Sequence, residues 1–404
     1  MGGEPAAVSS SRSDASGAAG PHPPPVPVLM VGPPPGLLGG MASVAGQMLT
    51  LDLEGRYRIE LFPLTFSAGA GELPLGRAAR HLGHLFHLAG AVRRSGAALV
   101  HVHACSGFSF YRAAADMIVS QVLGCRTVLH VHGAAFDHFF AESGVLSRRL
   151  IAACLGRAER VVALSEAWRR ALQAMSPAAR ISVIENAVEA PAVLPVRGHH
   201  GPCRFLLLAR MDRWKGVDDL LDAAAELRVR GCPFELVLAG PAGTAGDKDE
   251  LAAKIRARNL DPVGRYVGPV RGQEKVDLLR WADVYVQPSH HEGMPISLLE
   301  ALAFGLPVVA TRVGAVPELM VDGVHGRLVP PHRQDLLAKA MAELAERPAV
   351  RPAMSEAAAR LAEARFGLRR FQGDLLALYD GLTAPSRPGR PFLARAPAPF
   401  PKPA

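Results

Sequence analysis

The sequence has few cysteines and lacks the spacings that bind metal or build a disulfide framework. Its 404 residues include five cysteines, and none of them lies in a Cys-x-x-Cys or Cys/His pattern. A scattered set of odd number argues against a structural zinc site and against a disulfide scaffold. We therefore expect a protein of a reducing compartment, namely the cytoplasm.

A long apolar run is also missing. No stretch reaches the roughly 20 apolar residues that a membrane-spanning helix needs. Residues 1–27 are rich in Gly, Ser, Ala and Pro without the apolar centre of a signal peptide, and residues 384–404 are Pro-rich and basic. We interpret both ends as disordered. We expect a soluble protein, or one attached peripherally to the inner face of a membrane.

Acidic residues are outnumbered, but no nucleic-acid-binding pattern accompanies the net charge of +8. We find no aromatic and basic ribbon and no helix-turn-helix signature, so nucleic acid is not an expected partner. An anionic membrane surface or an acidic substrate fits the charge at least as well. Residues 77–94 contain four arginines, no acid, and apolar residues at helical spacing. They predict either a helix packed on a sheet or a face that docks on anionic lipid.

The sequence does contain two series of short apolar runs with helical patterns between them. The first series predicts strands at 26–32, 56–62, 97–103, 126–132, 160–165 and 181–186. After a break rich in Gly, Pro and His at 197–202, the second predicts strands at 204–210, 234–240, 265–270, 283–289 and 307–311. Continuous Val/Leu/Ile strands between helices indicate parallel sheets covered on both faces. Two series indicate an α/β chain of two doubly wound, Rossmann-like domains, whose ligands bind at the carboxyl ends of the strands.

Two acids stand in apolar surroundings in the stretch HEGMPISLLEALAFG at 291–305. Pro295 suits the start of a helix and Gly305 its end, and a helix that is apolar on nearly every side is normally buried. Glu292 and Glu300 are eight positions apart, roughly 12 Å if the segment is helical. This is about the separation between the sugar and the ribose of a nucleotide sugar. The alternative is that Glu292 caps the helix and Glu300 pairs with a cation in the core, and the spacing alone does not choose.

Fixed cations follow another predicted strand. Arg210 ends the strand at 204–210, and Lys215 lies in the loop before the next helix. Two cations at a strand end suit a diphosphate, which gains charge as it leaves. Taken alone, the pair favours an ordinary solvated loop.

A histidine and a glycine end the strand at 126–132. His132 could bond a hydroxyl or transfer a proton, and Gly133 would let a ligand approach the backbone. A core histidine with satisfied hydrogen bonds is the common alternative. His101 and His103, one strand earlier, are weaker candidates.

Neither a dinucleotide cofactor nor a metal is expected. The glycine-rich loop at 33–46 is not Gly-x-Gly-x-x-Gly, although Gly39 and Gly40 could still pass close to a phosphate or sugar. Asp247 and Asp249 resemble an Asp-x-Asp metal signature, but Glu250 and a helical pattern follow directly. This order is typical of a helix cap.

Several of these motifs together resemble glycosyltransferase family 4, a large retaining group with the GT-B fold. The resemblance is dense over residues 200–340, through RMDRWKG, HHEGMPISLLEALAFGLPVVATRVGAVPEL and VDGVHGRLVPP. It is thinner in the first half, through GLLGGMA, HVHGAAF, VVALSE and VIENAV. One departure is Glu185, where the family often has proline.

The resemblance implies a role for each candidate residue. Arg210 and Lys215 would bind the donor diphosphate, and Glu300 would hold the ribose hydroxyls. Glu292 would lie by the donor sugar. The remaining implied contacts are His132 with the transferred sugar, the amides of Gly293 and Met294 near that sugar, and Gly39 and Gly40 along the cleft. The family works without a metal, and the leaving phosphate is thought to help deprotonate the acceptor.

The same resemblance implies the domain organisation. We expect an acceptor-binding domain at 28–190, a nucleotide-sugar-binding domain at 191–365, and a helix at 366–383 that crosses back to the first domain. The expected activity is retaining transfer of a sugar from a UDP- or GDP-linked donor to a saccharide or lipid-linked acceptor, in polysaccharide or glycolipid biosynthesis. The alternatives are a sugar-nucleotide epimerase and a catalytically silent binding subunit.

Overall fold

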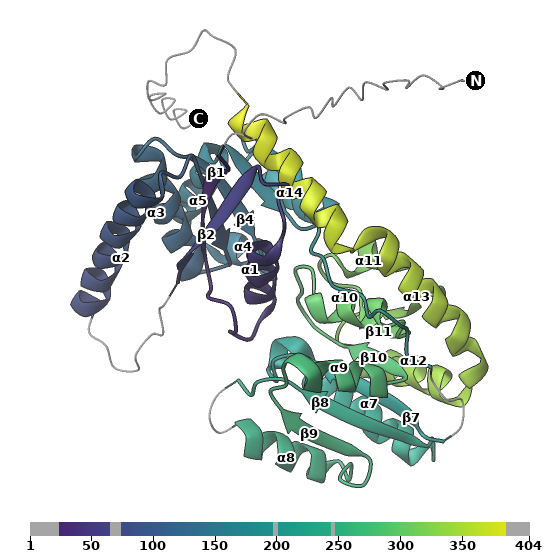
Figure 1. Ribbon diagram of the computed structural model, residues 1–404. Coiled ribbons are helices and arrows are strands. Elements are labelled where there is room, and N and C mark those ends of the chain that lie inside the picture. Colours follow the sequence, from purple (N-terminus) through teal and green to yellow (C-terminus); the bar gives the residue numbers. More distant parts are fainter. Residues whose placement is uncertain (1–23, 65–73, 197–200, 244–246, 385–404) are drawn as a thin grey trace, which may run out of the picture.

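The chain folds around two separate parallel sheets (Figure 1). A computed structural model describes residues 24–64, 74–196, 201–243 and 247–384. Most of the two segments that we interpret as disordered, 1–27 and 384–404, lies outside these residues. The first strand begins at Val26, so Val26 and Pro27 belong to the sheet rather than to the segment 1–27.

The first sheet has the strand order β2-β1-β3-β4-β5-β6, and all its pairs are parallel. Its strands are β1 (Val26–Gly32), β2 (Tyr57–Pro63), β3 (Leu99–Ala104), β4 (Arg126–Val131), β5 (Arg160–Ala163) and β6 (Ile181–Val183). Its helices are α1 (Gly40–Thr50), α2 (Pro74–Ser95), α3 (Phe108–Val122), α4 (Phe136–Glu142), α5 (Val145–Arg157) and α6 (Glu166–Met175).

The second sheet has the order β12-β11-β10-β7-β8-β9 and is also parallel. Its strands are β7 (Cys203–Leu208), β8 (Phe234–Ala239), β9 (Gly264–Gly268), β10 (Val284–Gln287), β11 (Val308–Thr311) and β12 (Gly326–Val329). The helices that follow are η1 (Arg213–Lys215), α7 (Val217–Val229), α8 (Asp247–Ala257), α9 (Gly272–Trp281), α10 (Ile296–Ala303), α11 (Val316–Leu319), α12 (Gln334–Glu346), η2 (Pro348–Val350), α13 (Arg351–Arg365) and α14 (Leu368–Thr383).

The predicted class, two doubly wound α/β domains, is confirmed. Every predicted strand exists, although seven of the eleven end one to three residues earlier than expected, because the final residues of those runs already belong to the loops at the sheet edge. One strand, β12, was missed. Its run of four residues contains Gly326 and Arg327, which hide the apolar pattern.

Helices α13 and α14 run along both domains (Figure 1). α13 packs on α10 of the second domain. α14 lies on the first domain, where Tyr57 donates a hydrogen bond to Asp380 at 2.8 Å and Tyr379 is 2.9 Å from His101. The two domains are therefore tied by a helical strap as well as by the linker after β6.

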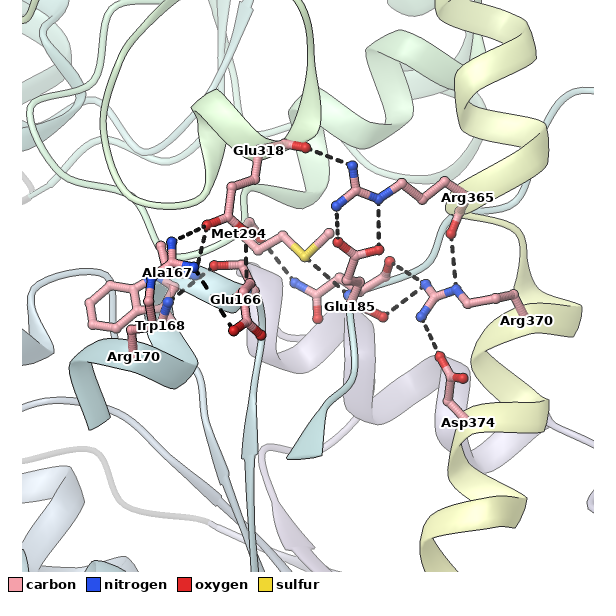
Figure 2. Close-up of polar contacts among 12 residues, drawn as sticks. Glu166, Ala167, Trp168, Arg170, Glu185, Met294, Glu318, Arg365, Arg370 and Asp374 are labelled. Atoms are coloured by element: carbon pink, nitrogen blue, oxygen red, sulfur yellow. Dashed lines mark hydrogen bonds and ion pairs between the residues drawn. The ribbon is translucent and has the colours of Figure 1, made fainter. Parts of the chain in front are cut away.

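A carboxylate of the second domain holds the start of a helix of the first (Figure 2). Glu318, in α11, accepts hydrogen bonds from the backbone N–H groups of Glu166 and Ala167 at 3.0 and 2.6 Å. These N–H groups open α6 and have no partner within their helix. An acid at this position is also favoured by the helix dipole. The contact thus fixes one domain against the other.

The linker itself is anchored by two arginines (Figure 2). The carboxylate of Glu185 forms a two-point ion pair with Arg365 at the end of α13. Arg365 also donates to the carbonyl oxygen of Glu318 at 2.6 Å. Arg370 of α14 donates to the carbonyl oxygens of Glu185 and Asn186 at 2.9 and 3.0 Å. Glu185, the residue that departs from the family pattern, is therefore the acid that binds the linker to the strap.

Candidate active site

The cation loop after β7 is shaped by a glycine. Gly216 has φ +65°, and a Cβ there would lie 2.0 Å from the carbonyl oxygen of Pro288. Only glycine allows this approach, which presses the loop against the end of β10. Asp212 accepts hydrogen bonds from the backbone N–H groups of Trp214 and Lys215 at 3.0 and 3.2 Å. Lys215 is held by this turn at the edge of the sheet.

Lys215 and Glu292 lie together, which the sequence did not indicate. The Lys215 Nζ is 2.6 Å from Glu292 Oε1, and the Ser289 hydroxyl donates to the same oxygen at 2.7 Å. Glu292 is buried, whereas Lys215 keeps about a quarter of its side chain exposed. The carboxylate is thus satisfied by a cation and a hydroxyl, as a buried charge requires. Glu292 does not cap α10, so that alternative is wrong.

A second glycine brings the loop after β11 against Glu292. Gly314 has φ +54°, and a Cβ there would lie 1.9 Å from the carbonyl oxygen of Glu292. Ala315 then donates its N–H to the carbonyl oxygen of Gly293 at 3.0 Å. The backbone of the Glu292 turn is held from both sides, which fixes the direction of its carboxylate.

Glu300 sits in α10 as expected but is not alone. It forms an ion pair with Lys275 of α9, and 18% of its side chain remains exposed. The alternative in which Glu300 pairs with a cation is therefore observed, although the pair is partly exposed rather than in the core. Lys275 was missed, because nothing in the sequence places α9 beside α10. Arg210 is more exposed than Lys215 and pairs with Asp212.

His132 follows β4, and its side chain points to its neighbours on the sheet. Its Nε2 is 2.8 Å from Nδ1 of His103. His101 and His130 form a second pair, with a nitrogen separation of 3.1 Å. Burial lowers the pKa of all four imidazoles, that of His103 to about 3, so all are neutral at pH 7. The two weaker candidates are thus part of one buried cluster with His132.

The glycines of the first domain serve different purposes. A Cβ on Gly133 would lie 2.5 Å from the Ser106 hydroxyl, so this glycine makes room for the protein itself. Gly39 and Gly40 stand at the start of α1, and a Cβ on Gly40 would lie 3.6 Å from Ile296 of the second domain. The start of α1 therefore faces the start of α10 across the domain boundary.

The two halves of the site meet at Gly293. A Cβ there would lie 3.1 Å from the carbonyl oxygen of His132. Met294, the next residue, is buried, and its carbonyl oxygen accepts a hydrogen bond from the Asn186 side chain at 2.9 Å. The fold brings His132 and the Glu292 turn to one place. Glu300 and Lys275 lie on the two neighbouring helices, α10 and α9.

Two groups of described residues place possible metal ligands within 4.8 Å of one another. One is His101, His103 and His130. The ring of His103 is within 30° of parallel to the other two, so the in-plane lone pairs do not converge on one point. The other is Asp219, His290 and His332, in which Asp219 and His290 already bond each other at 2.8 Å. Asp247 and Asp249 open α8.

Helix α2 exposes two large apolar side chains, which bears on the predicted contact with anionic lipid. Its residues Leu88 and Val92 are buried against the first domain, but Leu82 and Phe86 are 69% and 81% exposed. Residues 77–94 do form a helix packed on the first domain, as the first alternative predicts, but Leu82 and Phe86 lie outside its packed side. No helix among the described residues is long and apolar enough to cross a bilayer.

Two family profiles match this chain. The one described as Glycosyltransferase Family 4 matches residues 63–190, and the one described as Glycosyl transferases group 1 matches residues 198–361. The first match falls on the first domain and the second on the second domain. Together they cover most of the described chain.

Curated relatives are similar over part of their length. The D-inositol 3-phosphate glycosyltransferase of Saccharomonospora viridis is 34% identical over 232 residues, 55% of this chain and 53% of the relative. The amylovoran biosynthesis glycosyltransferase AmsK of Erwinia amylovora is 31% identical over 238 residues, 56% of each chain. The chain therefore spans about half the length of the curated relatives it matches.

Solved structures are similar over nearly the whole chain. Sucrose-phosphate synthase from Thermosynechococcus elongatus superposes with a TM-score of 0.75 over 89% of this chain and 99% of that one, at 19% identity. Anabaena HepE in complex with UDP-glucose gives 0.68 over 88% and 99%, at 20% identity. At such identities the likeness shows the fold, and the predicted GT-B arrangement is confirmed.

Proposed function

The chain belongs to the family 4, group 1 glycosyltransferases, and from that premise we propose that it transfers a sugar from a nucleoside-diphosphate sugar to a hydroxyl, with retention of configuration. The acceptor is a saccharide or a lipid-linked saccharide in cell-surface polysaccharide or glycolipid biosynthesis. The main support is the ion pair between Lys215 and the buried Glu292 at the carboxyl edge of the second sheet. The residue after Glu292, Gly293, lies against His132 of the first domain.

Lys215 and Arg210 bind the diphosphate of the donor in this proposal. Both are cations whose present partners, Glu292 and Asp212, are side chains of the same site. A diphosphate carries more charge than one carboxylate, and its charge rises as the bond to the sugar breaks. Cations held in a partly desolvated edge therefore stabilise the leaving group more than the ground state.

The two glutamates divide the donor between them. Glu292 accepts hydrogen bonds from hydroxyls of the transferred sugar, with the amides of Gly293 and Met294 nearby. Glu300 accepts from the ribose hydroxyls, after exchanging part of its contact with Lys275. Because cations already orient both carboxylates, binding the hydroxyls costs little reorganisation.

The first domain supplies the acceptor side. His132 contacts the transferred sugar near its reacting carbon, and Gly39 and Gly40 line the path of phosphate and acceptor. The acceptor oxygen forms a bond to the anomeric carbon while the bond from that carbon to the phosphate oxygen breaks. The acceptor proton passes to the leaving phosphate, so neither a protein base nor a metal is required.

The donor is first sought among UDP-sugars and GDP-sugars. The solved relatives HepE and TarM are described in complexes that contain UDP, which supports UDP as the first choice. Each nucleotide sugar is added at saturating concentration and the melting temperature is measured. A ligand at 100 times its dissociation constant adds about 2.7 kcal/mol to the free energy of unfolding.

Products are then identified by mass spectrometry with the stabilising donor and a panel of saccharide acceptors. A sugar-linked product supports the proposal. An altered donor without such a product would mean an epimerase. Binding without any turnover across the panel would mean a silent subunit, and either result would overturn the proposed activity.

Peripheral membrane contact belongs to the same proposal. α2 exposes Leu82 and Phe86 on its surface, and Arg93 and Arg94 are exposed near its end. Apolar side chains that insert at an interface and basic ones that meet anionic headgroups are the two attractions that hold a peripheral protein. This face would bring the cleft to a lipid-linked acceptor.

The membrane contact is tested by co-sedimentation with anionic and neutral vesicles. Leu82→Ser/Phe86→Ser and Arg93→Gln/Arg94→Gln should each weaken binding to anionic vesicles, the second more at low salt, where screening is weak. Val229→Ser, which changes an exposed apolar side chain of the second domain, is the matched control. If wild type ignores anionic vesicles at low salt, or both variants bind as wild type does, α2 is not a membrane face.

A further inference from the structure

Four histidines form two hydrogen-bonded pairs on one face of the first sheet. His101 and His103 are two positions apart in β3, and His130 and His132 have the same spacing at β4. Because side chains alternate along a strand and His103 is in register with His130, all four rings stand on the same face. The hydrogen-bonded pairs are His103–His132 and His101–His130. Neighbouring ring centroids in the cluster lie 4.0 to 5.2 Å apart, and the rings are stacked except for His101 and His130, which are tilted.

Each ring carries one N–H group. His101, His103 and His130 are fully buried and His132 is partly buried, and a charge on one ring would raise the energy of a charge on the next. Desolvation is the main cause that keeps the pKa of these groups low, and neighbouring histidines add to it for three of them, His101, His130 and His132. A neutral imidazole has one nitrogen that donates and one that accepts. In each pair, one ring must therefore be the donor and the other the acceptor.

The remaining nitrogens decide which ring donates. Among the described residues, Nε2 of His103 and Nε2 of His130 are buried without a partner. If His132 donated to His103, the proton of His103 would sit on Nε2, as a buried N–H with no acceptor. If His103 donates from Nδ1, its Nε2 is a bare lone pair. Orphaned buried N–H groups are rarer than unsatisfied acceptors, so the second arrangement is favoured.

We propose that His103 donates its Nδ1–H to Nε2 of His132 and thereby fixes the proton of His132 on Nδ1. Since a ring has two nitrogens, Nδ1–H is then the group that His132 has left for a ligand. Toward a ligand, His132 is then a hydrogen-bond donor and not a base. The tautomer follows from the cluster alone, whereas its consequence for sugar transfer rests on the proposed function.

This assignment refines the chemistry of the site. The Nδ1–H group of His132 can donate a hydrogen bond to a hydroxyl oxygen of the transferred sugar, or to an oxygen near the reacting carbon that gains negative charge. It cannot take the acceptor proton, which agrees with a leaving phosphate that does so. His103 is thus a positioning residue: it touches no substrate, and it acts through the proton of its neighbour.

The second pair offers a built-in control. By the same reasoning, His130 donates from Nδ1 to Nε2 of His101, and His101 donates to the Tyr379 oxygen at 2.9 Å. The hydrogen-bonded series of His130, His101 and Tyr379 has rings stacked against the first pair but, among the described residues, shares no side-chain hydrogen bond with it. Tyr379→Phe removes a buried partner of the cluster without changing the hydrogen bond between His103 and His132.

The tautomer is measured by NMR of the ligand-free protein labelled with ¹⁵N in its histidine rings. The signals of His132 are identified by their loss in His132→Gln. Wild type should show the proton of His132 on Nδ1, and so should Tyr379→Phe. His103→Asn keeps a donor N–H near the position of Nδ1 and should preserve the tautomer.

His103→Asp replaces the donor with an acceptor. It should move a proton to Nε2 of His132 and lower turnover on the order of 10²-fold, as the loss of one oriented donor does, while His103→Asn retains most turnover. A His132 that carries its proton on Nε2 in wild type would overturn the proposal, even if His103→Asp does not fold. The expected tautomer without sugar transfer on any donor would overturn the proposed function and leave this inference standing.

Discussion

The carboxyl edges of the two sheets present opposite kinds of polar groups. The first carries neutral imidazoles that bond one another, with His132 beside Gly293 of the second domain. The second carries ion pairs, and two of them, Lys215–Glu292 and Lys275–Glu300, contain residues of the candidate site. Charges can be exchanged for those of an incoming ligand, whereas a closed set of neutral hydrogen bonds can only orient its members. The second edge is therefore suited to hold an anion, and the first to position a fixed donor.

The largest effect expected from this difference is at Lys215. Lys215→Ala removes the cation that we propose binds the diphosphate, and it also leaves the buried carboxylate of Glu292 without its ion pair. Turnover should fall on the order of 10²-fold or more, as for the loss of one charge-stabilising donor. Steady-state kinetics measure it, and Lys254→Ala, a lysine of α8 with a similarly exposed side chain, is the control. Wild-type turnover in Lys215→Ala would contradict the assignment.

Acidification should lower stability mainly through the neutral histidines at the edge of the first sheet. The pKa of His103 is about 3 in the folded protein and about 6.5 when unfolded, so on acidification the unfolded chain binds the proton first. The contribution of neutral His103 to the free energy of unfolding is fully present above pH 6.5. It is lost as the pH falls toward 3, and the loss is about 2 kcal/mol at pH 5.

Urea unfolding at pH 7 and pH 5 measures this loss, and His103→Asn should reduce it by removing the titrating group. Equal pH dependence in wild type and His103→Asn would show that His103 is not held neutral in the folded state.

The two glutamates of the charged edge should differ from each other. Glu300→Gln should weaken binding of the free nucleoside diphosphate about tenfold, or 1.4 kcal/mol, because it removes a charged acceptor for the ribose. Glu292→Gln should leave nucleotide affinity close to normal and reduce sugar transfer. Calorimetry with the nucleotide alone compares them. Equal losses of affinity would end this division of roles.

The smallest effect is expected from metal removal. Asp249 lies in the first turn of α8 and its side chain is exposed, so Asp249→Asn should be nearly neutral. Activity should survive EDTA. Loss of activity that Mn²⁺ restores would point to acids of the charged edge, and Asp219→Asn would then test the group of Asp219, His290 and His332 directly.

Much of the fold was predictable because its signals are local. Apolar runs of strand length between helical patterns predict parallel sheets, and β12 was missed where Gly326 and Arg327 interrupt that signal. α10 was predicted well, since Pro295 and Gly305 limit it. The site was predicted as a set of residues at strand ends, but its pairs were not, since a lysine in a loop carries no mark of the acid it will meet.

The sequence by itself determined the class of the fold, the order of its elements and which side chains stand at the sheet edges, because these depend on neighbours within a few positions. Tertiary structure decided which of these side chains contact one another. The register of β3 against β4 joins four histidines, and the approach of Gly216 to β10 brings Lys215 to Glu292. The crossing helices bring Arg365 to Glu185, 180 positions away. Such contacts depend on how sheets, domains and linker pack, and no local pattern specifies that packing.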